Sequence, residues 1–455
     1  MSDVITIRKG LDIPIDGVAA QHVIDKLDIR SYAVKPTDFV GLTPKLLVAE
    51  GDAIKVGDAL FCDKNDERIR FTSPVGGMVK AVVRGEKRKI LEVVVEADGK
   101  IETSEYFKFS ENSEDLKNIM LQCGLWTMLR QRPFGTVANP DDEPKAIFVS
   151  AFSSAPLAPD YDFVMQGREE FFKKGLEALM KLTKGKVNVC FRHGTRDCET
   201  RDCETWDLGQ LQTPNSKLQT HFVKGPHPAG NVGTQIAHID PINKGDVVWT
   251  MNIQDVAVLG ELVSTGVYNP ERVIAVAGPN AVNPQYYKVK AGACIKDFEF
   301  KENSRVISGN VLSGSKIETD GFLGAYDDLV SAIPEGDYYD FMGWLMPGFK
   351  KYSFSRTFLS GFLPKLLKWD FNTNTHGDVR PLVFTGNFEK VFPFDIYPTQ
   401  LIKACVVGDI ELMENLGIYE VEPEDFALCE FIDVSKTDIQ AIVREALEKL
   451  RKEGV

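Results

Sequence analysis

Strand-like apolar runs alternate with helix-like segments between residues 116 and 260, and this alternation constrains the fold more than any other feature. Runs such as AIFVSAF and VNVCF are short and rich in branched or aromatic side chains, as buried strands are. The expected strands are 146–152, 187–191 and 246–249, and the expected helices are 114–131, 167–182 and 253–265. Strands that alternate with helices predict an α/β layer with a largely parallel sheet.

Residues 41–100 show a different pattern, in which short apolar runs are separated by tight turns at 50–52, 56–58 and 74–77. Short strands between such turns predict a small β-barrel or sandwich, and the pattern resembles a biotinyl/lipoyl-type domain. Lys64, in the sequence DKND, lies roughly where a carrier domain would present its modified lysine, but the usual sequence around that lysine is absent. We therefore expect a structural β domain within residues 1–100 and a polar, acidic linker at 101–115.

The second half of the chain divides into a β-rich part and a helical part. Short strands and turn signals run from 261 to about 330, and helical patterns dominate from about 376. In the last predicted helix, Thr437 is the expected N-cap and Gln440 completes a capping box. Gly454 follows the basic end of this helix as a stop signal.

The composition is that of an ordinary folded protein and excludes several classes. A formal net charge of −13 argues against general nucleic-acid binding, which needs a basic surface. The first 25 residues contain no apolar core of a secretory signal, and no run of 18 apolar residues predicts a membrane-spanning helix. The 8 cysteines are scattered, as expected of reduced thiols in the cytosol.

A glycine- and proline-rich loop opens the segment GPHPAGNVGTQIAHIDPINKGDVVW at 225–249. Neither GxGxxG nor GxxxxGK[ST] occurs in the chain, so no known nucleotide fingerprint explains this loop. Gly225, Gly230 and Gly233 would let a ligand approach the backbone, and His227 could hydrogen-bond a quinone oxygen. Alternatively, the glycines and prolines build a tight surface loop that contacts a partner, and the histidines are ordinary polar residues.

Residues 341–369 combine aromatic and basic side chains and form one acid-free run, FMGWLMPGFKKYSFSRTFLSGFLPKLLKW. In an acidic chain this composition suits an interface with a membrane or with membrane-embedded proteins. Pro347 and Pro364 interrupt it, so one long amphipathic helix is not expected. A core-forming linker whose lysines face solvent is the alternative. The candidate docking residues are Trp344, Phe349, Lys350, Lys351, Arg356 and Trp369.

No metal centre and no catalytic residue is predicted. His193, Cys198 and Cys203 are spaced by a tandem copy of TRDCE at 195–204, and the CxxC pairs typical of structural zinc are absent. No Ser-His-Asp order, HExxH or paired-carboxylate motif can be identified from spacing.

Four motifs spread along the chain resemble one family. KGLDIPIDG at 9–17, FTSPVGGMV at 71–79, the segment 225–249 and PFDIYPTQLIKACVVGDIE at 393–411 are similar to the NqrA family, one of the six subunit types of the Na+-translocating NADH:quinone reductases. The resemblance implies a peripheral protein, without a transmembrane helix, on the cytoplasmic face of the bacterial inner membrane. Its partners would be NqrB to NqrF, mainly the membrane-embedded ones, in a complex that couples NADH oxidation and quinone reduction to Na+ export.

The resemblance also implies a multidomain α+β fold and a division of labour. The expected parts are a lipoyl/biotinyl-like β domain, a Rossmann-like α/β domain, a β-grasp (SLBB-like) module, a basic aromatic docking segment and a helical domain. Their expected ranges are 1–100, 116–260, 261–330, 331–375 and 376–455. NADH, flavins and iron–sulfur centres would belong to partner proteins of the complex, and this chain would be structural or would help to shape a quinone site.

The helical domain resembles the cluster-binding domain of the RnfC protein of the Rnf complex and of the flavin-binding protein of complex I. In the Rnf-type proteins a CxxCxxCxxxCP run supplies the ligands. Here Pro423, Phe426, Cys429 and Asp433 stand at the corresponding positions, so one thiolate remains where a cluster needs four. We expect the scaffold without an iron–sulfur cluster, and Cys429 as a small buried apolar residue.

Two other function classes stay open on the sequence. A stand-alone quinone- or nucleotide-binding oxidoreductase would carry a chromophore, but the glycine fingerprints are missing. A lipoyl- or biotin-type carrier would carry a covalent group on Lys64 or on another lysine of the first domain.

Overall fold

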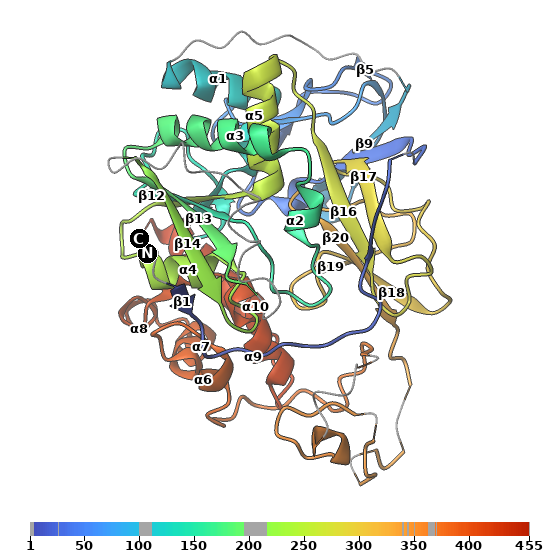
Figure 1. The fold of residues 1–455 in the computed structure, drawn as a ribbon, viewed down its shortest axis with the longest axis vertical. Helices are drawn as coiled ribbons and strands as arrows, with labels where there is room; N and C mark the ends of the chain where they lie inside the picture. The colour runs from blue at the N-terminus through green and yellow to red at the C-terminus, as the bar shows by residue number, and fades with distance from the viewer. Residues whose placement is uncertain are drawn as a thin grey trace.

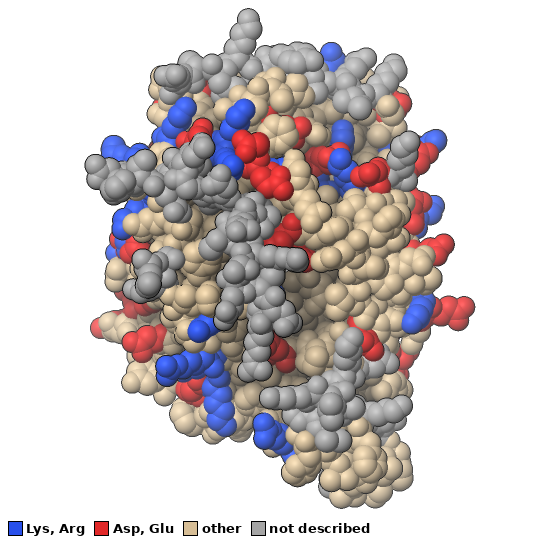
Figure 2. Space-filling model, viewed as in Figure 1, with Lys and Arg blue, Asp and Glu red and all other residues tan. Residues whose placement is uncertain are grey.

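The computed structural model contains an α/β domain, two β domains and a helical C-terminal region, which pack against one another (Figure 1). The structure describes residues 4–25, 27–99, 112–194, 216–338, 341–343, 345–349, 351–362, 369 and 371–454. On the face shown in Figure 2, acidic and basic side chains are interspersed over most of the described surface.

The α/β domain is built on a sheet whose described strands are ordered β1-β14-β13-β12-β15-β10-β11. The bounds are β1 Val4–Thr6, β14 Leu218–Lys224, β13 Lys186–Arg192, β12 Ala146–Ser150, β15 Val248–Asn252, β10 Arg130–Arg132 and β11 Thr136–Val137. The first five run parallel, and β10 and β11 add antiparallel pairs. The predicted α/β layer is therefore confirmed, with the strand order reversing between β12 and β15.

Helices cover both faces of this sheet, which explains why its central strand is apolar throughout. Ile147 and Val149 of β12 belong to the same core as α3 (Glu169–Leu182) and α5 (Ile253–Thr265), whereas Phe148 packs with Ile236 of α4 (Val232–Ile239). Helix α1 spans only Ser113–Cys123, so the expected helix at 114–131 was too long. It ends because Gly124 takes a left-handed conformation with φ of 82°.

The N-terminal β domain follows the predicted turns. One sheet contains β3 (Ser31–Val34), β9 (Ile90–Ala97), β8 (Gly77–Arg84) and β5 (Ala53–Ile54), and a second contains β4 (Pro44–Leu46), β6 (Ala59–Asp63) and β7 (Arg70–Thr72). The turns at 50–52 and 56–58 lie on either side of β5. The inner residues of β6 and β7, such as Phe61 and Phe71, stack at 4.8 Å between ring centroids.

The second β domain is a mixed sheet ordered β19-β18-β20-β16-β17-β2. Its strands are β19 Ser315–Ile317, β18 Ser304–Ser308, β20 Leu329–Pro334, β16 Glu271–Ala277, β17 Gln285–Lys290 and β2 Ala20–Ile24. Strand β2 comes from the N-terminus of the chain, far from the other strands in sequence.

An N-terminal strap, residues 7–19, connects β1 in the α/β sheet to β2 in the second β domain and crosses the molecule between them (Figure 1). Within the strap, the backbone N–H of Leu11 donates to His227 O at 2.8 Å, and Ile15 forms an isolated β-bridge with Trp369. Neither β1 nor β2 was predicted from the first 25 residues of the sequence. The strap ties the α/β domain, the second β domain and the C-terminal region together.

The helical C-terminal region contains α6 Phe388–Val391, α7 Pro398–Val407, α8 Ile410–Asn415, α9 Ala427–Ile432 and α10 Ile439–Glu453. The N-cap of α10 is Asp438, whose side chain accepts from Ala441 N, so the predicted cap at Thr437 was one residue early. Gly454 ends the helix in a left-handed conformation, as predicted.

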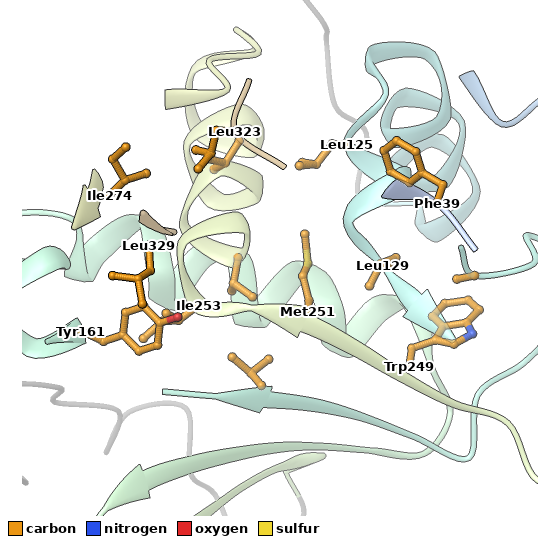
Figure 3. Packing of buried hydrophobic residues seen from close by; sticks show 14 of the residues in the cluster. Phe39, Leu125, Leu129, Tyr161, Trp249, Met251, Ile253, Ile274, Leu323 and Leu329 are labelled. Carbon is orange, nitrogen blue, oxygen red and sulfur yellow. The ribbon is translucent and has the colours of Figure 1, made fainter. Parts of the chain in front are cut away.

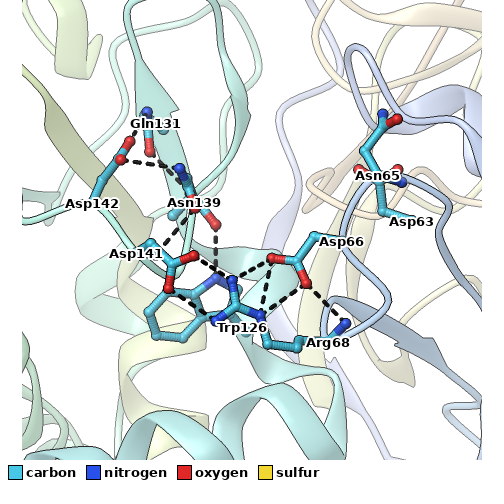
Figure 4. Close-up of polar contacts among 10 residues, drawn as sticks. Asp63, Asn65, Asp66, Arg68, Trp126, Gln131, Asn139, Asp141 and Asp142 are labelled. Carbon is cyan, nitrogen blue, oxygen red and sulfur yellow. Dashed lines mark hydrogen bonds and ion pairs between the residues drawn. The ribbon is translucent and has the colours of Figure 1, made fainter.

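One continuous core joins the domains. Figure 3 shows members of this core from different domains: Trp249 and Met251 of β15, Phe39 of the first β domain, and Leu323 and Leu329 of the second. Polar contacts add to this apolar junction. Arg68 of the first β domain donates to Asp141 of the α/β domain at 2.9 and 2.6 Å, and also to Asp66 (Figure 4).

None of the helices in the described part of the chain has the length and apolar character required to cross a bilayer.

Candidate functional site

The loop at 225–231 lies where ligands bind in many α/β proteins. It follows the carboxyl end of β14 and leads directly into α4. In open parallel sheets, ligands bind outside the carboxyl ends of the strands. The position of Gly225, His227 and Gly230 therefore fits the predicted ligand-facing role, and their contacts decide whether space for a ligand exists.

The glycines of this loop contact other parts of the same chain. A Cβ on Gly225 would come within 2.4 Å of Ile7 O, and one on Gly230 within 2.4 Å of Ser154 N. A Cβ on Gly233 would lie 2.5 Å from an Arg132 guanidinium nitrogen and from Asp425 Oδ1. The space beside each glycine is thus filled by the chain itself, which explains why no larger residue fits.

His227 is part of this internal packing, with 3% of its surface exposed. Its Nδ1 lies 3.1 Å from Ser154 Oγ, its backbone N–H donates to Asp12 Oδ1 at 2.9 Å, and its carbonyl accepts from Leu11 of the strap. Burial lowers the pKa of the imidazole to about 4, so it is neutral at physiological pH. The strap and the 153–154 turn thereby cover the side chain that was expected to face a quinone.

A buried charge cluster links the α/β sheet to the C-terminal helical region. Arg132 of β10 lies 3.3 Å from Glu422, 2.7 Å from Glu424 and 3.3 Å from Asp425, and only 2% of its side chain is exposed. Arg130, on the same strand, pairs with Glu422 at 2.9 Å. We call this group the Arg132 joint. Each partner is distant in sequence, so the joint fixes how the two domains meet.

Burial acts differently on the two buried acids of the Arg132 joint. For Glu422 burial raises the pKa, but Arg132 and Arg130 outweigh it, so the pKa lies below its usual value. For Asp425 burial dominates over the attraction of Arg132 and raises the pKa to about 7. Burial therefore favours the protonated form of Asp425, whereas the two arginines keep Glu422 ionised.

The four positions that were predicted to correspond to iron–sulfur ligands lie next to the Arg132 joint. Pro423 and Phe426 belong to the short turn η6 (Pro423–Phe426), and the thiol of Cys429 is fully buried in α9. Burial, reinforced by Glu389 and Asp433, raises the pKa of Cys429 well above its ordinary value. Asp433 accepts backbone hydrogen bonds from Ser435 and Thr437 at 3.0 and 2.9 Å. Within the described residues, no group of three or more His, Cys, Asp or Glu side chains is arranged to hold a metal ion.

The docking segment divides into an exposed part and a buried part. Apolar side chains on the exposed part include Phe341 at 89%, Phe349 at 69% and Phe362 at 74% of their full accessibility. We call the exposed apolar residues of this segment the apolar lobe. Its described members are Phe341, Met342, Leu345, Met346, Phe349, Leu359 and Phe362. The segment lies at the lower end of the molecule in Figure 1.

The other docking candidates differ from one another. Arg356 is exposed, and Lys351 donates to Gly343 O at 3.1 Å with its Nζ 6.0 Å from the Phe358 ring centroid. Trp369 is buried at 5% exposure and packs edge-to-face on Tyr352, with centroids 5.6 Å apart. Trp369 therefore serves the fold rather than the lobe. Trp344 and Lys350 lie outside the described residues.

The remaining candidates do not come together into a site. His193 is exposed just after β13, and Cys198, Cys203 and the TRDCE copies lie outside the described residues. Lys64 lies in the loop between β6 and β7, where its backbone N–H donates to Thr43 O at 2.8 Å.

Comparison with known sequences identifies the family along most of the chain. Residues 5–98 match the family described as NqrA N-terminal barrel-sandwich hybrid domain, and residues 111–268 match the NqrA second alpha/beta domain. Residues 273–319 match the SLBB family described as NQRA C-terminal domain. Full-length relatives decide the assignment. The NqrA protein of the Na+-translocating NADH-quinone reductase of Hahella chejuensis is 39% identical over 99% of this chain and 100% of its own length.

The chain belongs to the NqrA family.

Other members are similar over the same extent. The NqrA proteins of Neisseria meningitidis and Yersinia pseudotuberculosis are 38% and 37% identical, each over 99% of this chain and 100% of their own length. A solved NAD+-reducing [NiFe]-hydrogenase chain matches with a TM-score of 0.38 and 12% identity, over 75% of this chain and 61% of that chain, which is too low to bear on function. The expected order of barrel-sandwich, α/β and SLBB domains is confirmed by the family matches.

The Arg132 joint was not predicted from the sequence. A signal was present, because Arg130 and Arg132 alternate on a strand and Glu422, Glu424 and Asp425 form an acidic cluster. Nothing in either segment alone indicates that the two would meet across a separation of 293 positions.

Proposed function

We propose that this chain is the peripheral member of a Na+-translocating NADH:quinone reductase and that it docks on the cytoplasmic side of the membrane through the apolar lobe. Family membership over the whole length supports the assignment to the complex. The apolar lobe carries the docking proposal, because large exposed apolar patches on soluble domains mark interfaces with proteins or membranes. The partners that fit best are the hydrophobic, membrane-embedded proteins of the complex.

The composition of the lobe suits such a partner. Aromatic residues and methionine are enriched at the centres of protein interfaces, and charged residues are depleted there. Phe341, Met346 and Phe349 are exposed without an acidic residue between them in sequence, and Arg356 lies at the margin. Burying three such aromatic or thioether side chains would stabilise a complex by several kcal/mol, at about 1.5–3 kcal/mol for each side chain.

We further propose that NADH, flavins and iron–sulfur centres are held by the other proteins of the complex. Two observations support this division. The loop at the carboxyl edge of the α/β sheet is filled by Ile7, Ser154 and Arg132 instead of leaving space for a phosphate or ring. One cysteine remains at the cluster positions, and it is enclosed in α9. A quinone-facing role for Gly225, His227, Gly230 and Gly233 draws no support from these contacts, and we propose that this loop holds the strap in place.

The docking proposal is tested by co-purification. The double variant Phe341→Ser with Phe349→Ser is compared with Val379→Ser with Phe384→Ser, which changes apolar residues that are also exposed, at 78% and 62%, but lie outside the lobe. Tagged chains are purified from detergent-solubilised membranes, and Na+-stimulated quinone reduction by NADH is measured in the eluate. The lobe variant should lose the membrane-embedded partners and the activity, and the control should retain both. Equal recovery of both variants would refute docking through the lobe.

A further inference from the structure

A pocket of about 480 Å³ lies between the second β domain and the C-terminal helices. Pockets of roughly 300–1,000 Å³ at domain interfaces are typical of small-molecule sites, and such sites combine apolar walls with a few fixed polar groups. This pocket is separate from the loop at 225–231, from the Arg132 joint and from the apolar lobe. Its chemistry can be read from the two surfaces that face each other across it.

One wall is a single face of the β18-β19-β20 sheet. Arg305 of β18 is opposite Ile333 of β20, and Ile307 of β18 is opposite Lys316 of β19. Because side chains two residues apart on a strand share a face, these four point to the same side. All four line the pocket. The sheet therefore presents two isoleucines flanked by two cationic side chains.

The apolar part of the pocket extends beyond the sheet. Ile13 and Ile15 of the strap, 7% and 5% exposed, add aliphatic surface. Phe371 and Phe431 add aromatic surface, with ring centroids 5.8 Å apart. An apolar molecule of a few carbons would be enclosed on several sides by these residues.

The opposite wall, from α9 and α10, carries acids that are already engaged. Glu430 accepts from Gln440 N at 2.9 Å, and burial raises the pKa of its carboxyl. Asp438 accepts from Ala441 N as the cap of α10. Gln440 donates from its side chain to Leu312 O at 3.0 Å, which fixes the helix against the sheet side. Each acid therefore accepts a hydrogen bond from the backbone at the start of α10.

The two cationic side chains of the sheet differ in whether a carboxylate already pairs with them. Arg305 donates to both carboxylate oxygens of Glu335 at 2.8 and 2.7 Å, so its charge is compensated. Lys316 is exposed, and no carboxylate lies within ion-pair distance of its Nζ among the described residues. Lys316 lies near enough to Glu335 to help lower the pKa of that carboxyl, but it forms no ion pair with any described residue, and it stands at the edge of the pocket.

We propose that this pocket binds a small carboxylate with an apolar body, whose carboxylate pairs with Lys316 and whose apolar part lies against Ile13, Ile15, Ile307 and Ile333. The carboxylate supplies a direct ion-pair partner for Lys316, and hydrogen bonds between ammonium and carboxylate groups are stronger than those between neutral groups. The apolar body is held by its burial. A neutral analogue would keep the stabilisation from burial of its apolar body and would lose the ion pair with Lys316.

The test uses octanoate labelled with ¹³C at its carboxyl carbon, titrated into the purified full-length chain. The chemical shift of that carbon reports the surroundings of the carboxylate. We expect saturable binding with a dissociation constant in the millimolar range or below, as ligand efficiencies of about 0.3 kcal/mol per heavy atom imply. Lys316→Glu should weaken octanoate binding about tenfold or more, and Ser313→Trp, at the pocket wall, should block it.

Matched controls separate this site from non-specific apolar binding. Lys296→Glu changes an exposed lysine of the same domain outside the pocket, and it should leave octanoate binding unchanged. Octanamide should bind wild type and Lys316→Glu equally. Thermal unfolding of each variant should match the wild type, because residues 313 and 316 are exposed.

Absence of saturable binding, or equal binding by wild type and Lys316→Glu, would overturn the proposal. Binding by the isolated chain that disappears in the purified complex would also overturn it, because the pocket would then receive a segment of a partner protein.

Discussion

Arg132 of strand β10 lies 3.3 Å from Asp425 of the C-terminal region, and 2% and 0% of the two side chains are exposed. The contact joins residues 293 positions apart in the chain. It stands at the edge of the α/β sheet beside Gly233, where a Cβ would meet both side chains. A buried contact between charged side chains thus holds the helical domain against the sheet, in a place where apolar side chains would ordinarily pack.

Removing the arginine should destabilise the protein strongly. Arg132→Ala leaves Asp425 buried without its arginine partner and leaves Glu422 with Arg130 alone, at a cost of about 3–5 kcal/mol. The shift of the unfolding transition in denaturant measures this effect. Arg68→Ala is the control, because it removes an exposed pair with Asp141, whose side chain is 66% exposed. Equal shifts in the two variants would contradict a structural role of the Arg132 joint.

The Arg132 joint should also make stability depend on pH. Asp425 has a pKa of about 7 in the folded state and 3.8 as its ordinary value. The folded state therefore binds the proton more tightly, and this contribution to stability is complete below about pH 3.8 and is lost as the pH rises through about 7. The charged groups that face Asp425 are Arg132 from β10 and Glu422 and Glu424 from its own segment. Arg130 from β10 and Arg444 from α10 act on the neighbouring Glu422.

Asp425→Asn tests this dependence directly, because the amide keeps the shape and cannot titrate. Unfolding of wild type and variant is followed from about pH 5 to 8 in otherwise identical buffers. The wild type should lose stability relative to the variant as the pH rises, by up to about 1.4 kcal/mol per pH unit. A difference between the two proteins that stays constant over this range would show that Asp425 does not titrate there.

The role of the glycine-rich loop as internal packing predicts intolerance of even one methyl group. Gly230→Ala would place a Cβ 2.4 Å from Ser154 N, so the backbone must shift at a cost of about 1–3 kcal/mol. Gly377→Ala is the matched control, because its nearest neighbour lies 3.9 Å away. Thermal unfolding measures both. A Gly230→Ala protein as stable as Gly377→Ala would favour an open, ligand-facing loop instead.

The scaffold role of the first β domain predicts an unmodified chain. Peptide mass spectrometry of the protein from its host should show that peptides containing Lys64 carry no added group. A covalent addition on Lys64 would revive the carrier alternative, since the residue lies in the β6–β7 loop.

Individual helices and strands could be predicted where the pattern of neighbouring residues determines the structure. The segment 167–182 was expected to be helical and becomes α3 with bounds Glu169–Leu182, because its apolar residues form one stripe. The run at 146–152 becomes β12 because both of its faces are covered by helices. The end of α1 was misplaced because helical spacing continues past Gly124, and only the backbone conformation of that glycine stops the helix.

Long-range pairings could not be predicted. The strap connects β1 in one sheet to β2 in another. The sequence of neither short strand indicates which strand it pairs with. For the candidate sites the limitation was the same. The glycines at 225, 230 and 233 were expected to let a ligand approach the backbone, and nothing in the sequence indicates that Ile7, Ser154 and Arg132 lie against them. Trp369 and Phe349 look alike in sequence, yet one is buried and the other exposed.

Site-specific photo-crosslinking tests docking through the apolar lobe most directly. A benzophenone amino acid is placed at Phe349 in one chain and at Phe384 in another, both exposed and aromatic in the wild type. After irradiation of membranes that contain the assembled complex, Phe349 should yield a crosslink to a membrane-embedded partner, whereas Phe384 should yield none. Crosslinking from Phe384 alone, or from neither position in a complex that retains Na+-stimulated quinone reduction, would contradict the account.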